Sequence, residues 1–324
     1  MHSNKSYSDN SPILFIVAPC FNEEDVLPET SKRLAEKIEF LCAKEEISEQ
    51  SKIFFIDDGS MDNTWEIIEK YYSENPKRFG GIKLTKNKGH QKALLCGLLS
   101  LKSYCDMIIS IDADLQDDIN IIDEMVVKFK SGCEIVYGVR SDRNTDSFFK
   151  RTTALGFYSL MRLLGVDILH NHADFRLMGK RSLDALSEYG ETNLFLRGII
   201  PMIGYKTGIV YYSRAERFAG TSKYPLKKML AFSFEGITSL SIKPIRMITW
   251  LGILIFCISI GLIVYFLFQH FSGFTITGWS SIIVSLWGIG GLVLLAIGII
   301  GEYIGKIYLE SKQRPHFHVE QVLK

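Results

Sequence analysis

The chain has 324 residues and a formal net charge of +1 at pH 7, from 37 lysines and arginines against 36 aspartates and glutamates. This length allows one sizeable domain and a further segment, and the balanced charge predicts no nucleic-acid partner. The six cysteines show neither a metal-binding spacing nor a disulfide pattern, so we expect them to fill the core of a protein in a reducing compartment.

Apolar runs alternate with helical patterns along the first 140 residues, after a polar start (residues 1–11) that we expect to be disordered. The alternation predicts an α/β fold, with a mainly parallel sheet and helices on both of its faces. In such sheets, ligands bind beyond the carboxyl ends of the strands. The expected strands are 13–18, 53–56, 81–85, 107–111 and 134–137, and the expected helices are 26–43, 62–72, 88–102 and one that begins after residue 118.

Polar clusters follow the first four predicted strands. They are Asn22-Glu23-Glu24, Asp57-Asp58-Gly59-Ser60, Asn87-Lys88-Gly89-His90 and Asp112-Ala113-Asp114-Leu115-Gln116-Asp117. In the fourth cluster, two carboxylates one residue apart follow a buried strand, where hard oxygen ligands suit Mg²⁺ or Mn²⁺ that carries substrate phosphates. Capping of a helix N-terminus is the alternative use of these acids, and for Asp117 and Asp118 both uses stay open. The sequence has no P-loop and no Gly-x-Gly-x-x-Gly turn, which argues against a P-loop NTPase or a dinucleotide enzyme.

The C-terminal part of the chain has a different composition. No Asp, Glu, Lys or Arg occurs between Arg246 and Glu302, and the stretches 247–268 and 280–301 are each apolar and about 20 residues long. We therefore expect two transmembrane helices within 247–301, with buried helices of a soluble core as the alternative. The connection between them lacks basic residues, whereas both flanks carry them, so the positive-inside rule predicts that both termini are cytoplasmic. The polar N-terminus shows no signal-peptide core, so we expect the large domain to stay in the cytoplasm.

Two segments flank the predicted membrane spans. Residues 224–246 mix apolar and basic residues at helical spacing, which predicts a juxtamembrane amphipathic helix on the inner leaflet of the lipid bilayer. An ordinary helix that packs on the domain is the alternative. We expect residues 302–324 to form a cytoplasmic C-terminal tail.

The four clusters, taken with Ala18-Pro19-Cys20-Phe21, Asp174-Phe175-Arg176-Leu177 and the run from Arg217 to Tyr224, resemble family-2 glycosyltransferases of the GT-A fold. The two C-terminal spans make the chain similar to the polyprenyl-phosphate sugar transferases, which include the bactoprenol glucosyltransferases and dolichyl-phosphate mannose synthase. The resemblance covers about residues 12 to 310, and it implies a cytoplasmic GT-A catalytic domain over residues 12–223. One departure is Cys20-Phe21, where the family usually has a small residue followed by Tyr, so a phenol hydrogen bond is lost there.

The resemblance also implies roles for the residues at matching positions. The nucleotide sugar would be bound by Pro19, Phe21, Glu23, Asp58, Asp112 and Ala113. The metal ion, Mg²⁺ or Mn²⁺, would be held by Asp112, Asp114 and Gln116. The acceptor phosphate would be bound by Arg140, Arg151, Arg217 and Lys223. The catalytic carboxylates would be Asp112, Asp114 and Asp174, the last either as a base or as a group that orients substrate.

For some of these residues a structural use is the alternative. Glu23 and Asp58 could cap helices, and Arg140 and Arg151 could be surface charges. His170 and His172 are separated by one residue, but no third ligand lies nearby in the sequence, so we do not expect them to bind metal.

The activity that the resemblance implies is transfer of a hexose, glucose from UDP-glucose first, to undecaprenyl phosphate with inversion. The reaction would take place at the bacterial inner membrane and give a lipid-linked sugar for modification of a cell-envelope glycan. GDP-mannose, UDP-galactose and UDP-N-acetylglucosamine stay open as donors, as does a homo-oligomer. A processive polysaccharide synthase is disfavoured because its Gln-x-x-Arg-Trp motif and further spans are missing. A non-catalytic membrane protein that binds a lipid phosphate is the alternative from another class.

Overall fold

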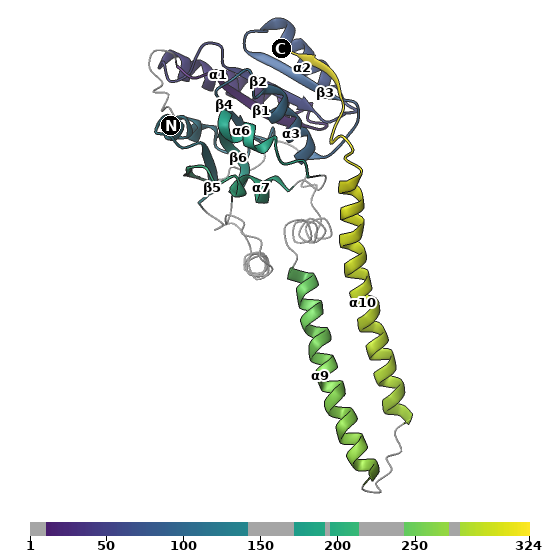
Figure 1. Ribbon diagram of the computed structural model, residues 1–324. Helices are drawn as coiled ribbons and strands as arrows, with labels where there is room; N and C mark the ends of the chain where they lie inside the picture. The colour runs from purple at the N-terminus through teal and green to yellow at the C-terminus, as the bar shows by residue number, and fades with distance from the viewer. Residues whose placement is uncertain (1–10, 142–171, 192–194, 214–242, 272–278) are drawn as a thin grey trace. The chain divides into compact units, whose positions relative to one another are not determined.

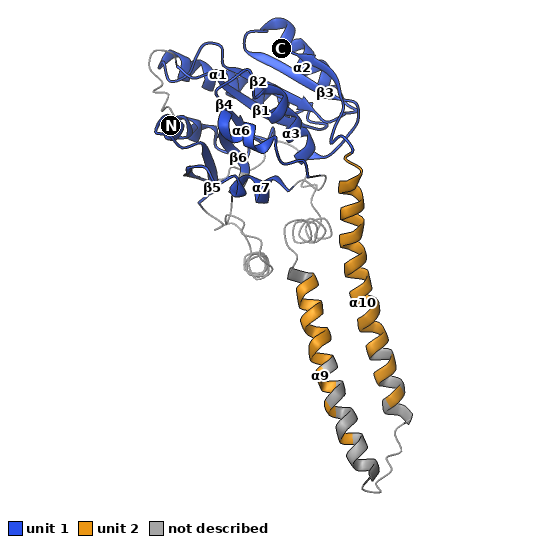
Figure 2. Ribbon diagram, in the orientation of Figure 1, with its two compact units in different colours: residues 1–158, 168–225, 314–324 blue, residues 159–167, 226–313 orange. Residues whose placement is uncertain are grey.

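The computed structural model describes residues 11–141, 172–191, 195–213, 243–271 and 279–324 (Figure 1). The chain divides into two compact units (Figure 2). The first unit takes residues 1–158, 168–225 and 314–324, and the second takes residues 159–167 and 226–313. The segments expected to be a disordered N-terminus and an interfacial helix lie outside the described residues, except for their last positions (11 and 243–246).

The first unit is built on one eight-stranded sheet, in the order β7-β5-β6-β4-β1-β2-β3-β8. All five predicted strands are present, and three further strands (β6, β7 and β8) join them. The strands are β1 (Leu14–Cys20), β2 (Lys52–Asp57), β3 (Phe79–Leu84), β4 (Met107–Ser110), β5 (Ile135–Arg140), β6 (His172–Gly179), β7 (Thr207–Tyr212) and β8 (Val319–Leu323).

The sheet is mostly parallel, as predicted, but it is not uniform. The block β4-β1-β2-β3 is parallel throughout, and β5 is parallel to β7. Strand β6 runs antiparallel to both β4 and β5, and β8 runs antiparallel to β3. Strand β6 therefore joins the two parallel parts of the sheet, and it carries Asp174 beside the end of β4.

Helices cover both faces of the sheet, as predicted. Helices α1 (Leu27–Ala43), α2 (Thr64–Glu74) and α4 (Ile122–Lys130) bury their apolar sides in one cluster of core residues, to which β1 contributes Ile16. Helices α3 (His90–Leu101), α6 (Lys180–Leu186) and α7 (Leu196–Met202) share a second cluster, to which β1 contributes Val17. Neighbouring residues of a strand point to opposite faces, so all seven residues of β1 are buried.

Helix α3 lies unusually close to the sheet. A Cβ atom on its Gly97 would come within 2.5 Å of Val17 Cγ1 on β1, so a larger residue at this position requires a shift of the helix or of the strand side chains. The close approach fixes α3, whose first residue is His90, against the strand ends that carry the polar clusters.

The predicted C-terminal tail ends in an ordered strand. Strand β8 pairs with β3 at the edge of the sheet, and Thr85 N–H donates to the carbonyl oxygen of His318 at 3.1 Å. The Tyr72 hydroxyl of α2 donates to the carbonyl oxygen of Lys324 at 2.8 Å. The end of the tail therefore belongs to the same sheet as the candidate site, whereas residues 302–311 lie in helix α10.

In the described residues, the second unit contains α9 (Lys243–Phe271) and α10 (Trp279–Ser311), in which the two predicted membrane spans lie. Within the described part of these helices, Ile289–Ser311 is long and apolar enough to cross a membrane, and Ile245–Ile255 is a shorter apolar stretch. Crossing by both helices stays a prediction.

Candidate active site

The loop that follows β4, residues 112–117, is the centre of the candidate site and is called the metal loop below. Its side chains alternate in exposure, because Asp112, Asp114 and Gln116 are partly exposed, whereas Ala113, Leu115 and Asp117 are buried. The three predicted metal ligands are thus the side chains of the loop that solvent can reach. All three offer oxygen donors.

The backbone of the metal loop is held in a strained conformation. Leu115, between two of the predicted ligands, has a positive φ of 56°, which costs a bulky residue about 1–3 kcal/mol. The buried Thr30 hydroxyl of α1 donates to the carbonyl oxygen of Ala113 at 2.7 Å. Gln116 N–H donates to Asp114 Oδ1 at 3.2 Å. Contacts from inside and outside the loop therefore maintain this conformation.

The residues of the metal loop fit a hard divalent cation. Desolvation and the nearby carboxylates of Asp174, Asp117 and Asp114 raise the pKa of Asp112 to about 6, although His90 acts in the opposite direction. A cation would relieve this concentration of negative charge. Among the described residues, no three His, Cys, Asp or Glu side chains form a metal cluster. If two carboxylates and the Gln116 amide held such an ion, phosphate oxygens and water would occupy its remaining coordination positions.

Asp174, predicted to be catalytic, lies on β6 between two arginines. It forms an ion pair with the fully buried Arg176, and Arg197 of α7 donates to its two oxygens from Nε at 3.2 Å and Nη2 at 2.9 Å. Burial alone would raise the pKa of Asp174, but Arg197 and Arg176 together hold it well below its usual range. The carboxylate is therefore ionised and a weak proton acceptor at neutral pH.

His90 connects Asp174 with the metal loop. Its Nε2 atom lies 3.5 Å from Asp112 Oδ1 and 3.7 Å from Asp174 Oδ2. The sequence analysis gave His90 no role, although it is part of the third polar cluster. The structure places two of the three predicted catalytic carboxylates around this one imidazole.

The predicted nucleotide-binding residues lie at the ends of adjacent parallel strands. Pro19 is buried in β1, Phe21 and Glu23 follow that strand and are partly exposed, and Ala113 is buried. Asp58, which follows β2, is also buried, and its two oxygens accept the N–H groups of Lys88 at 2.7 Å and Gly89 at 2.8 Å. Asp58 therefore fixes the turn that precedes α3, and its contact with a base stays a prediction.

Arg140, predicted to bind the acceptor phosphate, lies at the end of β5 and contacts two protein groups. Its Nη2 atom lies 3.3 Å from Asp117 Oδ1, and its Nε donates to the Tyr212 hydroxyl at 3.2 Å. Its contact with phosphate stays a prediction. The other three predicted acceptor-binding residues, Arg151, Arg217 and Lys223, lie outside the described residues.

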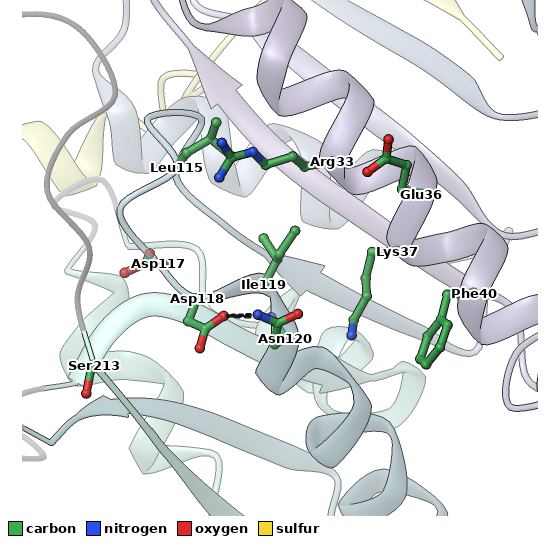
Figure 3. A pocket seen from close by; sticks show the side chains of 10 residues that line it. All are labelled: Arg33, Glu36, Lys37, Phe40, Leu115, Asp117, Asp118, Ile119, Asn120 and Ser213. Atoms are coloured by element: carbon green, nitrogen blue, oxygen red, sulfur yellow. Dashed lines mark hydrogen bonds between the residues drawn. The ribbon is translucent and has the colours of Figure 1, made fainter.

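A cavity of about 730 Å³ lies between α1 and the metal loop, lined by Arg33, Lys37, Leu115, Asp117, Asp118 and Ser213 among others (Figure 3). At its wall, Asp118 accepts from the N–H and the side-chain amide of Asn120, so it caps the short helix η1 (Ile119–Ile121). Capping is thus the use that the structure shows for Asp118, whereas Asp117 is buried in an ion pair.

Besides His90, three residues of the site were missed by the sequence analysis. Tyr212 and Arg197 contact acids 95 and 23 positions away in the chain, so no local pattern indicates them. Arg176 stands in the Asp-Phe-Arg-Leu run, which was the signal that could have found it.

Comparisons with known proteins identify the family of the chain. The model of Glycosyl transferase family 2 matches residues 15–187. The uncharacterized glycosyltransferase YkoT of Bacillus subtilis (strain 168) is 56% identical over 311 residues, which cover 96% of this chain and 92% of YkoT. The bactoprenol glucosyl transferase of Shigella phage SfV is 38% identical over 307 residues, which cover 94% of this chain and 97% of that protein.

A third relative is the prophage bactoprenol glucosyl transferase homolog of Escherichia coli (strain K12), which is 37% identical over 311 residues that cover 95% of this chain and 99% of that protein. Among solved structures, glucosyl-3-phosphoglycerate synthase from Mycobacterium tuberculosis aligns with a TM-score of 0.43 and 17% identity, over 71% of this chain and 79% of that one. The family match spans more than half of the chain and these relatives span nearly all of it, and so the chain belongs to glycosyl transferase family 2.

Proposed function

We propose that this glycosyltransferase moves glucose from UDP-glucose to undecaprenyl phosphate, with inversion, at the cytoplasmic face of a bacterial membrane. The observation that carries the proposal is the match to the bactoprenol glucosyl transferase of phage SfV over 94% of the chain. The metal loop supports it, because Asp112, Asp114 and Gln116 present oxygen donors of the kind that hold Mg²⁺ or Mn²⁺ at a diphosphate. The product would be a lipid-linked sugar for a cell-envelope glycan.

In the proposed reaction, an oxygen of the acceptor phosphate attacks C1 of glucose from the face opposite UDP. The bond between C1 and the diphosphate oxygen breaks, its electron pair leaves with UDP, and the configuration at C1 inverts. A bound divalent ion supplies stabilisation of the negative charge that develops on UDP. The second pKa of a phosphate monoester lies near 6, so the acceptor needs no strong base at neutral pH.

The geometry around Asp174 supports an orienting role for this residue instead of a role as base. Its pKa is held low by two arginines, and a base is not required for a phosphate acceptor. An ionised Asp174 would instead hold the Arg197 guanidinium and the His90 ring, and through His90 it faces Asp112. We propose that the acceptor phosphate binds to Arg140, Arg151, Arg217 and Lys223.

A sugar-transfer assay on the purified full-length chain tests the proposed function. The protein in detergent would receive undecaprenyl phosphate, Mn²⁺ and one of four radiolabelled donors: UDP-glucose, UDP-galactose, UDP-N-acetylglucosamine or GDP-mannose. The expected result is label in the lipid extract from UDP-glucose, and none when the acceptor is left out.

Two results would contradict the proposal in different ways. Transfer from another donor at a higher rate would replace glucose as the sugar but keep the lipid acceptor. A folded protein that binds undecaprenyl phosphate yet transfers none of the four sugars would favour the non-catalytic alternative.

A further inference from the structure

Asp117, Arg140 and Tyr212 form a buried group, called the Asp117 cluster below, that connects the metal loop with two neighbouring strands. Asp117 follows Gln116 directly, Arg140 ends β5 and Tyr212 ends β7. Arg140 and Tyr212 are register partners in the parallel pair β5–β7. The Tyr212 hydroxyl donates to Asp117 Oδ1 at 2.5 Å, and Arg140 Nη2 lies 3.3 Å from the same oxygen.

The Asp117 carboxylate depends on these two partners. Its side chain is fully buried, and its Oδ2 atom has no hydrogen-bond partner among the described residues. Tyr212 is 3% exposed, and burial together with the charge of Asp117 raises the pKa of its phenol, so the hydroxyl keeps its proton and donates. A buried carboxylate needs such donors, and Tyr212 supplies the shorter of the two contacts to Oδ1.

The position of the cluster matters because of the backbone beside it. Leu115 holds a left-handed conformation between Asp114 and Gln116, and the surrounding contacts must maintain it. Thr30 fixes the loop at Ala113, before the strained residue. Asp117 is the first residue after Gln116, so the hydrogen bond from Tyr212 fixes the loop on the other side.

We infer that Tyr212 is a positioning residue for the metal site, which acts through Asp117 to hold Gln116 and Asp114 in the geometry that binds the ion. This inference rests on the proposed metal-dependent function. Tyr212 touches no predicted ligand itself.

Mn²⁺ binding to the variant Tyr212→Phe tests the inference. The ring would still pack edge-on against Phe175, whose centroid is 5.7 Å away, while the hydrogen bond to Asp117 is lost. The control is Tyr211→Phe, since Tyr211 is the preceding residue of β7 and is 65% exposed. Bound Mn²⁺ would be measured by electron paramagnetic resonance on the full chain in detergent with UDP, and UDP affinity without metal would be measured by calorimetry.

For Tyr212→Phe we expect Mn²⁺ affinity to fall by about tenfold, the low end of the loss when a direct partner of a metal ligand is removed, because Tyr212 acts on the ligands through Asp117. UDP affinity without metal should stay at the wild-type value, which a general loss of structure would not allow. Tyr211→Phe should bind both like the wild type. Mn²⁺ affinity of Tyr212→Phe within twofold of the wild type would overturn the inference and leave the proposed function intact.

A second variant keeps the test decisive if Tyr212→Phe does not fold. Asp117→Asn keeps the size of the side chain and weakens its hydrogen bond with Tyr212. The control is Asp118→Asn, which removes the same negative charge from the next residue. Asp118 does not contact Tyr212 in the described structure. The expected result is a larger loss of Mn²⁺ affinity for Asp117→Asn than for Asp118→Asn, and equal losses would overturn the inference. Failure of the wild type itself to bind Mn²⁺ with UDP would overturn the proposed metal site and the inference together.

Discussion

Asp112 and Asp114 lie two residues apart in the metal loop but have different surroundings. Asp112 faces His90 at 3.5 Å and is close to the negative charge of Asp174, whereas Asp114 accepts a hydrogen bond from the loop's own backbone. Both carboxylates stay at the accessible side of the loop. At the scale of single residues, the negative charges of Asp112 and Asp114 are therefore only partly balanced by groups of the protein.

Replacing one of these acids should remove activity without unfolding the protein. For Asp114→Asn we expect kcat to fall on the order of a hundredfold or more, because Lewis-acid stabilisation of the leaving group is worth several kcal/mol. Initial rates of sugar transfer and the thermal midpoint would be measured side by side, with Asp118→Asn as the control that keeps the predicted metal ligands. Full turnover in excess chelator would show that no metal ion takes part.

The ion pairs of Asp174 predict a dependence of stability on pH. Its pKa lies well below the value of about 3.9 in an unfolded chain, so its contribution to folding is complete above pH 4–5 and is lost as the pH falls toward the folded pKa. Asp174→Asn should therefore lower the free energy of unfolding by about 3–5 kcal/mol at pH 7, because Arg176 stays buried without its partner.

The difference in the free energy of unfolding between the wild type and Asp174→Asn should become smaller as the pH is lowered below 4. Thermal unfolding at pH 7, 5 and 3.5 would measure it. Asp184→Asn is the matched control, since its carboxylate is 54% exposed and pairs with Lys102 on the surface. A destabilisation by Asp174→Asn that stays constant with pH would mean that the ionised carboxylate is not what stabilises the fold.

At the scale of elements, the sequence predicted the part of the sheet that is built from consecutive strand and helix pairs. Strands β1 to β5 and their helices follow from apolar periodicity, because each strand is buried on both faces and each helix has one buried side. The direction of β6 could not be predicted in this way. Strand direction depends on the connection between β5 and β6, for which the sequence analysis assigned no element.

Strand β8 shows why other elements were missed. Its sequence Val-Glu-Gln-Val-Leu is short and half polar, it follows a long apolar segment, and its partner β3 lies more than 230 positions earlier. Distance along the chain also explains why part of the candidate site was missed. The acids of the metal loop are local in sequence, whereas Tyr212 and Arg197 reach them only through the fold.

Removal of β8 should weaken the first unit. For a chain that ends at His318 we expect a loss on the order of 2–4 kcal/mol, from a few ladder hydrogen bonds at 0.5–1.5 kcal/mol each, and more aggregation because the β3 edge is exposed. Thermal unfolding and light scattering would measure both effects. Glu320→Gln removes only a surface ion pair with Lys83 at 3.8 Å and should behave like the wild type. An unchanged midpoint would show that β8 does not contribute.

At the scale of the whole molecule, the chain combines a sheet with a buried apolar core and helices with exposed apolar side chains. Leu254 of α9 and Leu286 and Leu294 of α10 are each more than half exposed, and α10 contains a stretch that is long enough to cross a membrane. Exposed apolar side chains in such numbers indicate an apolar environment. These observations support association of the protein with a membrane.

The number of crossings can be tested with reporters. The basic flanks and the uncharged connection predict that a reporter fused after Lys324 is cytoplasmic and that one inserted near Gly273 is external. Alkaline phosphatase and green fluorescent protein fusions would measure the two positions. A cytoplasmic reporter at Gly273 would mean that the chain does not cross the membrane twice.

Strand β8 also connects folding with the order of synthesis. It lies after α9 and α10 in the chain, so it leaves the ribosome only after both helices have been made. Until then, β3 presents unpaired backbone groups along its edge, which are a target for wrong pairing and proteolysis. A chain that is interrupted within the apolar segment therefore keeps an incomplete sheet. The sheet of the first unit is therefore completed only after the apolar segment has been made.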